Sequence, residues 1–486
     1  MIQVPKCMST QHPDNVHQPF FVENSLIGGE DEIQEAFYAF SHLGCDEQMW
    51  DFEGKEVDNF VVKKLLTKNE PFFRQKKLGR DVFLTYRVPN PDVERGEAKI
   101  LLETLENIPR SYDAARLFYG EDITPIFEVI LPMATNAKAI NRIYHYYKDF
   151  VAGKQDKKLS DDGMTIGEWI GDFKPQAVNV IPLFEDKTHM LAGAAILKEY
   201  LSDKKVEYQR VFLARSDPAV NYGHLGAVLL VKIAAQRLYK LKEELGIPIY
   251  PILGAGSAPF RGNLRPQNVD NIIKGYPSIH TFTIQSSFKF DNPPEMVQSA
   301  IKKLRESRDL TPVPVDEERA LTLLEKYSAE YIRQVKKLAP VINEMAAQVP
   351  KRRKRKLHIG LFGYSRSMDE VTLPRAITFT AAMYSLGAPP ELLGLNALSD
   401  DDISFVKSIY PSVEKDLSDA YMFANPESPF LPPEVLSAVK RILPDAAVES
   451  GHRCLTDEII SSIKAMDRRD LSNAVAQAAD LRGFLG

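Results

Sequence analysis

The sequence predicts an α/β protein built on a (β/α)8 barrel of the TIM type, with extra helices and helical insertions. Short runs rich in β-branched and aromatic residues recur along the chain, and nearly all are continuously apolar, as in parallel strands covered on both faces. Amphipathic helical patterns separate these runs. The length of 486 residues accommodates such a barrel with insertions as one domain. A doubly wound open sheet is the alternative architecture.

Eight such runs are predicted to form the strands. In chain order they are 45–52, 81–88, 125–133, 177–184, 210–214, 249–254, 279–285 and 357–363. Between them, helical periodicity predicts helices such as 189–201 and 223–245.

The later part of the chain has a different pattern. Residues 316–349 predict a long helix bent near Pro340, because an internal proline removes a backbone hydrogen bond. We expect one domain over residues 1–486, with barrel strands within about 45–363 and a helical C-terminal region over about 400–486.

Composition and charge favour a cytoplasmic protein. The 61 basic and 66 acidic residues leave a formal charge of -5, which provides no general attraction to nucleic acid or an anionic membrane. Three cysteines without a CxxC spacing argue for a reducing compartment and against a disulfide framework or a structural zinc site. No apolar run reaches membrane length, and the polar N-terminal segment resembles neither a secretory nor a mitochondrial leader. We therefore expect no nucleic-acid or membrane partner.

Two carboxylates follow neighbouring predicted strands. Glu185 comes directly after 177–184, and Asp217 comes shortly after 210–214. A barrel enzyme carries its catalytic groups at these strand ends, and Mg²⁺ takes one or two protein carboxylates. The simpler interpretation is a helix N-cap, which is favoured for Asp217 in "SDP" and is about as good as the functional one for Glu185. Both interpretations are open from the residues alone.

Basic side chains follow other strand ends. "GAGSAPFRGNLRP" carries Arg261 and Arg265, "YSRS" carries Arg366, and Arg87 ends the second predicted strand. Guanidinium groups match phosphate and carboxylate geometry, although a lone loop of this kind is more often a flexible surface loop. The loop lacks the Walker A spacing, which disfavours nucleotide binding. The compact run "KRRKRK" (351–356) is interpreted as a solvated loop, with a subunit contact or a site for an anionic metabolite as alternatives.

Several long motifs occur in one order across almost the whole chain. They are "CMSTQHPDN", "MWDFEGK", "PLFED", "RSDPAVNYGHLGA", "GSAPFRGNLRP" and "GYSRSM" followed by "LPRAITFTAAMYSLGAPPE". The set closely resembles the short, archaeal-type phosphoenolpyruvate carboxylases. The resemblance implies a cytoplasmic homotetramer built on a (β/α)8 barrel, which uses Mg²⁺ or Mn²⁺ to convert phosphoenolpyruvate and bicarbonate into oxaloacetate and phosphate.

The resemblance also implies roles for individual residues. "TQHPD" is similar to the "TAHPT" element of the longer carboxylases, which makes His12 the catalytic base that takes the proton of carboxyphosphate beside the pyruvate enolate. Glu185 and Asp217 match the metal ligands. Arg261 matches the arginine that stabilises carboxyphosphate. The arginines that match the phosphate and carboxylate site are Arg366 and Arg375.

The chain departs from the longer enzymes at two places. Leu253 and Ala255 stand where those enzymes carry the histidine and arginine of "HGRGG", and Val220 stands near the position of a lysine. The missing phosphate contacts are expected from Arg265 or Arg87. Regulation by aspartate or acetyl-CoA does not transfer, because the chain lacks much of the regulatory helical material.

Two other functions are compatible with the residues. One is another enolate-forming barrel enzyme of the citrate lyase type, which would share the carboxylate pair but would not release phosphate with its product. The other is a non-catalytic binding protein whose "KRRKRK" run contacts nucleic acid, against which the overall acidic balance counts.

Overall fold

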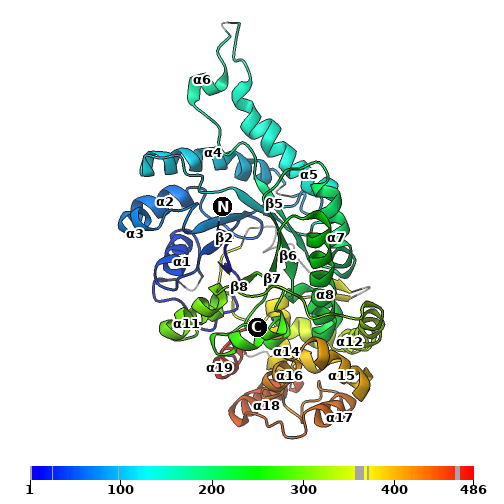
Figure 1. The fold of residues 1–486 in the computed structure, drawn as a ribbon. Helices are drawn as coiled ribbons and strands as arrows, with labels where there is room; N and C mark the ends of the chain where they lie inside the picture. Colours follow the sequence, from blue (N-terminus) through cyan, green and yellow to red (C-terminus); the bar gives the residue numbers. More distant parts are fainter. Residues whose placement is uncertain are drawn as a thin grey trace.

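A closed barrel of eight parallel strands forms the centre of the computed structural model (Figure 1). The structure describes residues 3–24, 26–96, 98–161, 163–355, 371–465 and 471–486, and the backbone of 366–368. The barrel strands are β1 (Cys7–Ser9), β2 (Glu47–Asp51), β3 (Phe83–Arg87), β4 (Glu128–Leu131), β5 (Asn179–Phe184), β6 (Gln209–Ala214), β7 (Ile249–Gly254) and β8 (Thr281–Ile284). The predicted fold class is therefore confirmed.

One predicted strand is not among the eight that close the barrel. Seven predicted runs, from 45–52 to 279–285, correspond to β2 through β8. The first position is taken by β1, which pairs in parallel with both β2 and β8, with Cys7 opposite Phe282. The run 357–363, predicted as the eighth strand, lies outside the described residues, and the barrel closes without it. A three-residue strand between polar residues has too little pattern to be found from sequence, whereas a continuous apolar run imitates a buried strand.

Helices surround the barrel and extend beyond it. Those within the barrel region are α1 (Glu30–Ser41), α2 (Val61–Lys68), α3 (Glu70–Gln75), α4 (Ile100–Tyr119), α5 (Ala137–His145), α6 (Ile166–Ile170), α7 (Lys187–Leu201), α8 (Ser216–Leu245), α9 (Val269–Gly275), α10 (Ser286–Phe290) and α11 (Pro294–Arg305). Those that follow are α12 (Glu317–Ala346), α14 (Ala376–Ser385), α15 (Asp400–Ile409), α16 (Val413–Tyr421), α17 (Pro433–Ile442), α18 (Ser450–Lys464) and α19 (Ser472–Arg482). A two-stranded sheet of β9 (Arg366–Met368) and β10 (Val371–Leu373) lies outside the barrel. None of the helices in the described part of the chain combines the length and the apolar character that a membrane crossing needs.

Two long helices pack together beside β6 and β7. The helix α12 contains Pro340, as predicted, and α8 begins seven residues before the predicted start at residue 223. At Gly223 the backbone of α8 leaves the helical region, with φ of 79°. A Cβ there would lie 2.7 Å from the ring of Tyr327 on α12. Only glycine permits both this φ and this close approach.

An extension projects away from the barrel (Figure 1). The helix α5 continues into a π-helical turn, η1 (Tyr146–Val151), and a 3-10 turn, η2 (Ala152–Asp156), before the chain turns back through α6. Trp169 and Ile170 on α6 are 65% and 57% exposed. Apolar side chains presented in this way are typical of a surface that contacts another molecule.

The opposite end of the barrel from the C-terminal strand ends is held by a buried ion cluster. Arg210, at the start of β6, donates to both carboxylate oxygens of Glu47 at 2.7 and 2.8 Å and to Glu128 at 2.9 Å. The side chains of Arg210 and Glu47 are fully buried. The cluster therefore depends on complete pairing, since a buried charge without its partner is costly.

Replacing Arg210 by methionine is expected to lower the free energy of unfolding by about 3–5 kcal/mol, because two buried carboxylates lose their partner. Denaturant unfolding followed by circular dichroism measures this change. The matched control is Arg142→Met, which removes an exposed pair with Asp92 at 3.2 Å and should change stability by about 1 kcal/mol or less. Equal effects of the two changes would contradict the role given to the cluster.

Candidate active site

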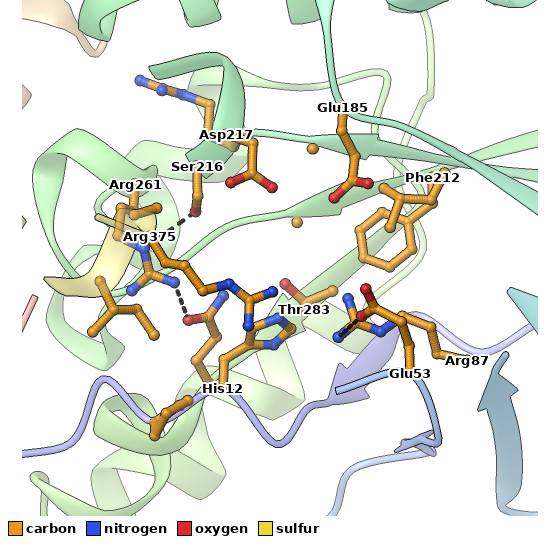
Figure 2. Close-up of a pocket in the computed structure, with 18 of the residues that line it drawn as sticks. His12, Glu53, Arg87, Glu185, Phe212, Ser216, Asp217, Arg261, Thr283 and Arg375 are labelled. Carbon is orange, nitrogen blue, oxygen red and sulfur yellow. Dashed lines mark hydrogen bonds and ion pairs between the residues drawn. The ribbon is translucent and has the colours of Figure 1, made fainter. Parts of the chain in front are cut away.

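A polar cavity opens at the C-terminal ends of the barrel strands (Figure 2). Because all eight strands are parallel, the residues that follow them meet at this one end. In Figure 2 the carboxylates of Glu185 and Asp217 both point into the cavity, and His12 faces them from the opposite side. The predicted site residues that line the cavity are His12, Arg87, Glu185, Asp217, Arg261 and Arg375.

Two predicted site residues are not brought to the cavity by the described structure. The guanidinium of Arg265 donates to Asp419 at 2.9 Å, and Arg265 is not among the lining residues. Arg366 begins β9, but its side chain lies outside what the structure describes. A phosphate contact from either residue stays a prediction.

The two carboxylates reach the cavity from neighbouring strands. Glu185 directly follows β5, and Asp217 is the second residue of α8, which follows β6. Asp217 is not the N-cap residue of α8, because Arg215 occupies that position. At α7 the N-cap is Asp186, whose side chain accepts a hydrogen bond from the backbone of His189 at 3.0 Å.

The donor set fits a hard divalent cation. Two carboxylates line one cavity, and Mg²⁺ binds through one or two protein carboxylates while waters and substrate oxygens complete its shell. One oxygen of Glu185 accepts a hydrogen bond from the backbone nitrogen of Met133 at 2.9 Å, which orients the carboxylate. Within the described part of the chain, no group of three or more histidine, cysteine or acidic side chains forms a closed metal cluster. The pair is therefore suited to an ion that also coordinates substrate.

Hydrogen bonds on both sides of His12 fix the segment that carries it. The side-chain oxygen of Gln11 accepts from the backbone of Asp51 at 2.9 Å, and Asp14 accepts from the backbone of Ser287 at 2.8 Å. The Nδ1 atom of His12 lies 3.0 Å from the hydroxyl of Thr10. This contact leaves Nε2 as the ring nitrogen available to a substrate.

The environment of His12 favours the neutral imidazole. Burial and the nearby positive charges of Lys55 and Arg87 hold the pKa of His12 well below its ordinary value of 6.5. A neutral imidazole has a free lone pair at neutral pH. The residue is therefore in the form that a general base requires.

Arg261 is held from several directions. Its side chain is 2% exposed, and it donates to the carbonyl oxygen of Gly486 at 2.7 Å, to Ser216 at 3.2 Å and to Asp14 at 3.3 Å. It also donates to the side chain of Gln285. The contact with Gly486 joins residues 225 positions apart. No local sequence pattern could have indicated it.

The cavity contains basic residues that the sequence analysis did not assign to the site. Lys55 bonds to Asp51, which also forms two hydrogen bonds with Arg87, at 2.7 and 2.8 Å. Burial lowers the pKa of Lys55 to about 8. Arg215 lines the cavity and is fully buried, and its guanidinium donates to the carbonyl oxygen of Phe260 at 3.1 Å, to the hydroxyl of Tyr276 at 3.3 Å and to Nδ1 of His224 at 2.9 Å. Lys55 belongs to the motif "MWDFEGK" and Arg215 to "RSDP". Nothing in the spacing of either motif distinguishes these residues from ordinary surface cations.

The interpretation of "KRRKRK" as a solvated loop is wrong for two of its residues. Arg353 is buried and pairs with Glu32 and Glu35, each at 2.7 Å. Arg355 lines the cavity. A basic run looks solvated in sequence, whereas its buried acidic partners are more than 300 positions away.

Similarity to known proteins extends over essentially the whole chain. The family model described as phosphoenolpyruvate carboxylase matches residues 4–486. The phosphoenolpyruvate carboxylase of Methanothermobacter thermautotrophicus is 58% identical over 485 residues, and that of Methanospirillum hungatei is 56% identical over 489, each covering 100% of both chains. The Pyrococcus furiosus enzyme is 51% identical and covers 99% of this chain and 100% of its own. The chain therefore belongs to the archaeal-type phosphoenolpyruvate carboxylases, which are carboxylating lyases.

Proposed function

We propose that the cavity forms oxaloacetate and phosphate from phosphoenolpyruvate and bicarbonate through carboxyphosphate and pyruvate enolate. An oxygen of bicarbonate attacks the phosphorus, and the bond from phosphorus to the enol oxygen breaks. Carboxyphosphate then loses its proton and separates into CO₂ and phosphate, and the methylene carbon of the enolate bonds to CO₂. The observation that supports this course is the shared cavity of His12, two carboxylates and several guanidinium groups.

His12 is proposed as the base that takes the proton of carboxyphosphate. Its neutral form and the free Nε2 atom suit this role. The anionic substrate raises the pKa of the imidazole when it binds, because an opposite charge stabilises the protonated form. The base therefore becomes stronger once the substrate is in place.

Glu185 and Asp217 are proposed to hold Mg²⁺ or Mn²⁺. When bound, the ion polarises substrate oxygens and stabilises the negative charge of the enolate. Arg261 and Arg375 are proposed to stabilise the charge that develops on carboxyphosphate and phosphate. The hydrogen bonds that hold Arg261 mean that little reorganisation is needed during the reaction.

A coupled assay for oxaloacetate, run with and without bicarbonate, tests the proposed reaction. We expect bicarbonate-dependent product, one phosphate for each oxaloacetate, and loss of activity with a chelator that Mg²⁺ or Mn²⁺ restores. A lyase of the citrate lyase type would form product without stoichiometric phosphate. Purified protein that makes no oxaloacetate with substrate, bicarbonate and metal present would contradict the proposal.

We propose that the protein is a cytoplasmic homotetramer, as the resemblance to the family implies. The exposed Trp169 and Ile170 on the extension support association with other copies, since water-exposed apolar groups of this size are favourably buried in an interface. Light scattering should then give a mass near four times 54.8 kDa. A monomeric mass at working concentration would contradict the assembly.

Replacing Gly486 by alanine is expected to lower kcat by about 10-fold or more, although the residue is not proposed to contact substrate. An added methyl group would overlap the carbonyl oxygen of Ile377 and crowd the backbone nitrogen of Ala381. The displaced residue would lose its hydrogen bond to Arg261, and charge-assisted hydrogen bonds contribute about 1.5–3 kcal/mol. Steady-state kinetics measures the change. Gly483→Ala is the control. It places a methyl group in open space, so it introduces backbone strain at a left-handed φ of 72° without the steric overlap expected at Gly486.

A further inference from the structure

We propose that Arg355 binds an oxyanion of phosphoenolpyruvate, and that Arg352 and Arg353 anchor the segment that carries it. The inference rests on the proposed function and assigns a substrate contact that the sequence motifs do not include. Two observations carry it: the way this segment is anchored, and the state of charge pairing around the cavity.

The backbone of the segment is fixed against the N-terminal region. The backbone nitrogen of Ile27 donates to the carbonyl oxygen of Arg352, and Lys354 donates back to the carbonyl oxygen of Ile27, both at 3.0 Å. The side chain of Arg352 donates to the carbonyl oxygen of Asn15 at 3.2 Å. The segment is thus attached at two points, Asn15 and Ile27, to the chain that follows His12.

Arg353 anchors the segment from inside. Its guanidinium is fully buried and donates to Glu32, Glu35 and Ser286 at distances of 2.7 to 3.0 Å. Glu35 also pairs with the buried Lys289, at 2.6 Å. Arg353 is therefore a positioning residue, held in place by its two buried carboxylate partners.

Side chains alternate in direction along an extended chain, which explains why one basic run has both buried and solvent-exposed residues. Lys354 is exposed and Arg353 is buried, and the next residue, Arg355, lines the cavity. Successive side chains of an extended segment point to opposite sides. Lys351, at the exposed start of the run, offers the same charge outside the cavity.

Three other cations that line the cavity have anionic partners in the protein. Arg87 pairs with Asp51, as does Lys55, and Arg261 pairs with Asp14. Among the described residues, the half-buried Arg355 makes no hydrogen bond and no ion pair, and Asp51 and Glu53 attract its charge only from beyond contact distance. Burial and the positive charge of Arg375 lower the pKa of Arg355 to about 10, so the guanidinium is still charged at neutral pH.

A half-buried charge without a partner is unfavourable unless a ligand compensates it. Phosphoenolpyruvate carries a phosphate and a carboxylate, whereas bicarbonate carries one negative charge. A guanidinium binds phosphate or carboxylate oxygens through parallel hydrogen bonds. The more highly charged substrate therefore gains most from Arg355.

The Arg355→Gln variant tests the inference. We expect its KM for phosphoenolpyruvate to rise about 10- to 100-fold, since a hydrogen bond to a charged group contributes about 1.5–3 kcal/mol. The KM for bicarbonate should change little. Arg355→Lys, which keeps the charge but not the forked geometry, should fall between the variant and the wild type. The matched control is Lys351→Gln, which removes one positive charge from the same run outside the cavity and should leave both KM values unchanged.

A binding measurement separates this inference from the proposed reaction. Phosphoenolpyruvate without bicarbonate should raise the unfolding temperature of the wild type and of Lys351→Gln, and should raise that of Arg355→Gln much less. Unchanged protection and KM in Arg355→Gln, or a rise confined to the KM for bicarbonate, would overturn the inference. If the wild type binds phosphoenolpyruvate in this way but forms no oxaloacetate, the proposed function fails and the binding role of Arg355 stands. Should Arg355→Gln unfold at room temperature, Arg355→Lys decides the matter by the same two measurements.

Discussion

Replacing His12 by asparagine is expected to lower the rate of oxaloacetate formation by about 100- to 10,000-fold, the usual contribution of a general base. Asparagine is close in size to histidine and can hydrogen-bond to Thr10, but it cannot accept a proton from carboxyphosphate. Attack of bicarbonate on phosphorus precedes the step assigned to His12. Some bicarbonate-dependent release of phosphate should therefore persist without an equal amount of oxaloacetate.

Parallel assays of phosphate and oxaloacetate measure this separation. His17→Asn is the control, because His17 is 60% exposed and lies in the same segment outside the cavity. It should keep the wild-type ratio of the two products. A His12→Asn enzyme that forms oxaloacetate at the wild-type rate would exclude His12 as the base.

The pH dependence of kcat/KM offers a second test of the same role. This parameter reports groups of the free enzyme, in which burial and the charges of Lys55 and Arg87 lower the pKa of His12. A base is inactive once protonated, so the fall in kcat/KM due to His12 should begin only at a pH below 6.5. The fall in kcat should lie at higher pH, because the bound anion raises the pKa. If kcat/KM instead fell at a higher pH than kcat, the result would contradict the environment described for His12.

Replacing Glu185 by glutamine is expected to raise the Mg²⁺ or Mn²⁺ concentration for half-maximal activity by about 100-fold or more. Loss of a group outside the coordination shell already costs about 10- to 100-fold in metal affinity, and Glu185 is proposed as a ligand itself. The amide keeps the size of the side chain, and its oxygen can still accept the hydrogen bond from the backbone of Met133. A loss of metal affinity would therefore result from the missing negative charge rather than from a change in the shape of the side chain.

Metal titration of activity and direct Mn²⁺ binding by electron paramagnetic resonance both measure the effect. Asp186→Asn is the matched control, since this adjacent carboxylate caps α7 and does not line the cavity. It should leave metal affinity unchanged while slightly lowering stability. Asp217→Asn should behave like Glu185→Gln. Wild-type Mn²⁺ affinity in both variants of the proposed pair would place the metal elsewhere.

Much of the barrel could be predicted because its strands are local patterns. Seven of the eight strands lie within predicted runs that are long enough to distinguish from their surroundings. The parallel arrangement then predicts that Glu185 and Asp217 face the same end, which the structure confirms. The short β1 was missed because its position depends on pairing with β2 and β8 rather than on its own three residues.

The sequence by itself determined the fold class, the family and six of the residues that line the cavity, because these depend on local periodicity and on motifs that stay together in the chain. Only the tertiary structure decided which basic residues have partners. It showed that Arg265 pairs with Asp419, that Arg353 is buried and that Gly486 contacts Arg261. Pairing depends on distances between residues more than 150 positions apart. The sequence does not show how deeply a charged residue is buried or which residues surround it, and both must be known before its chemical role can be assigned.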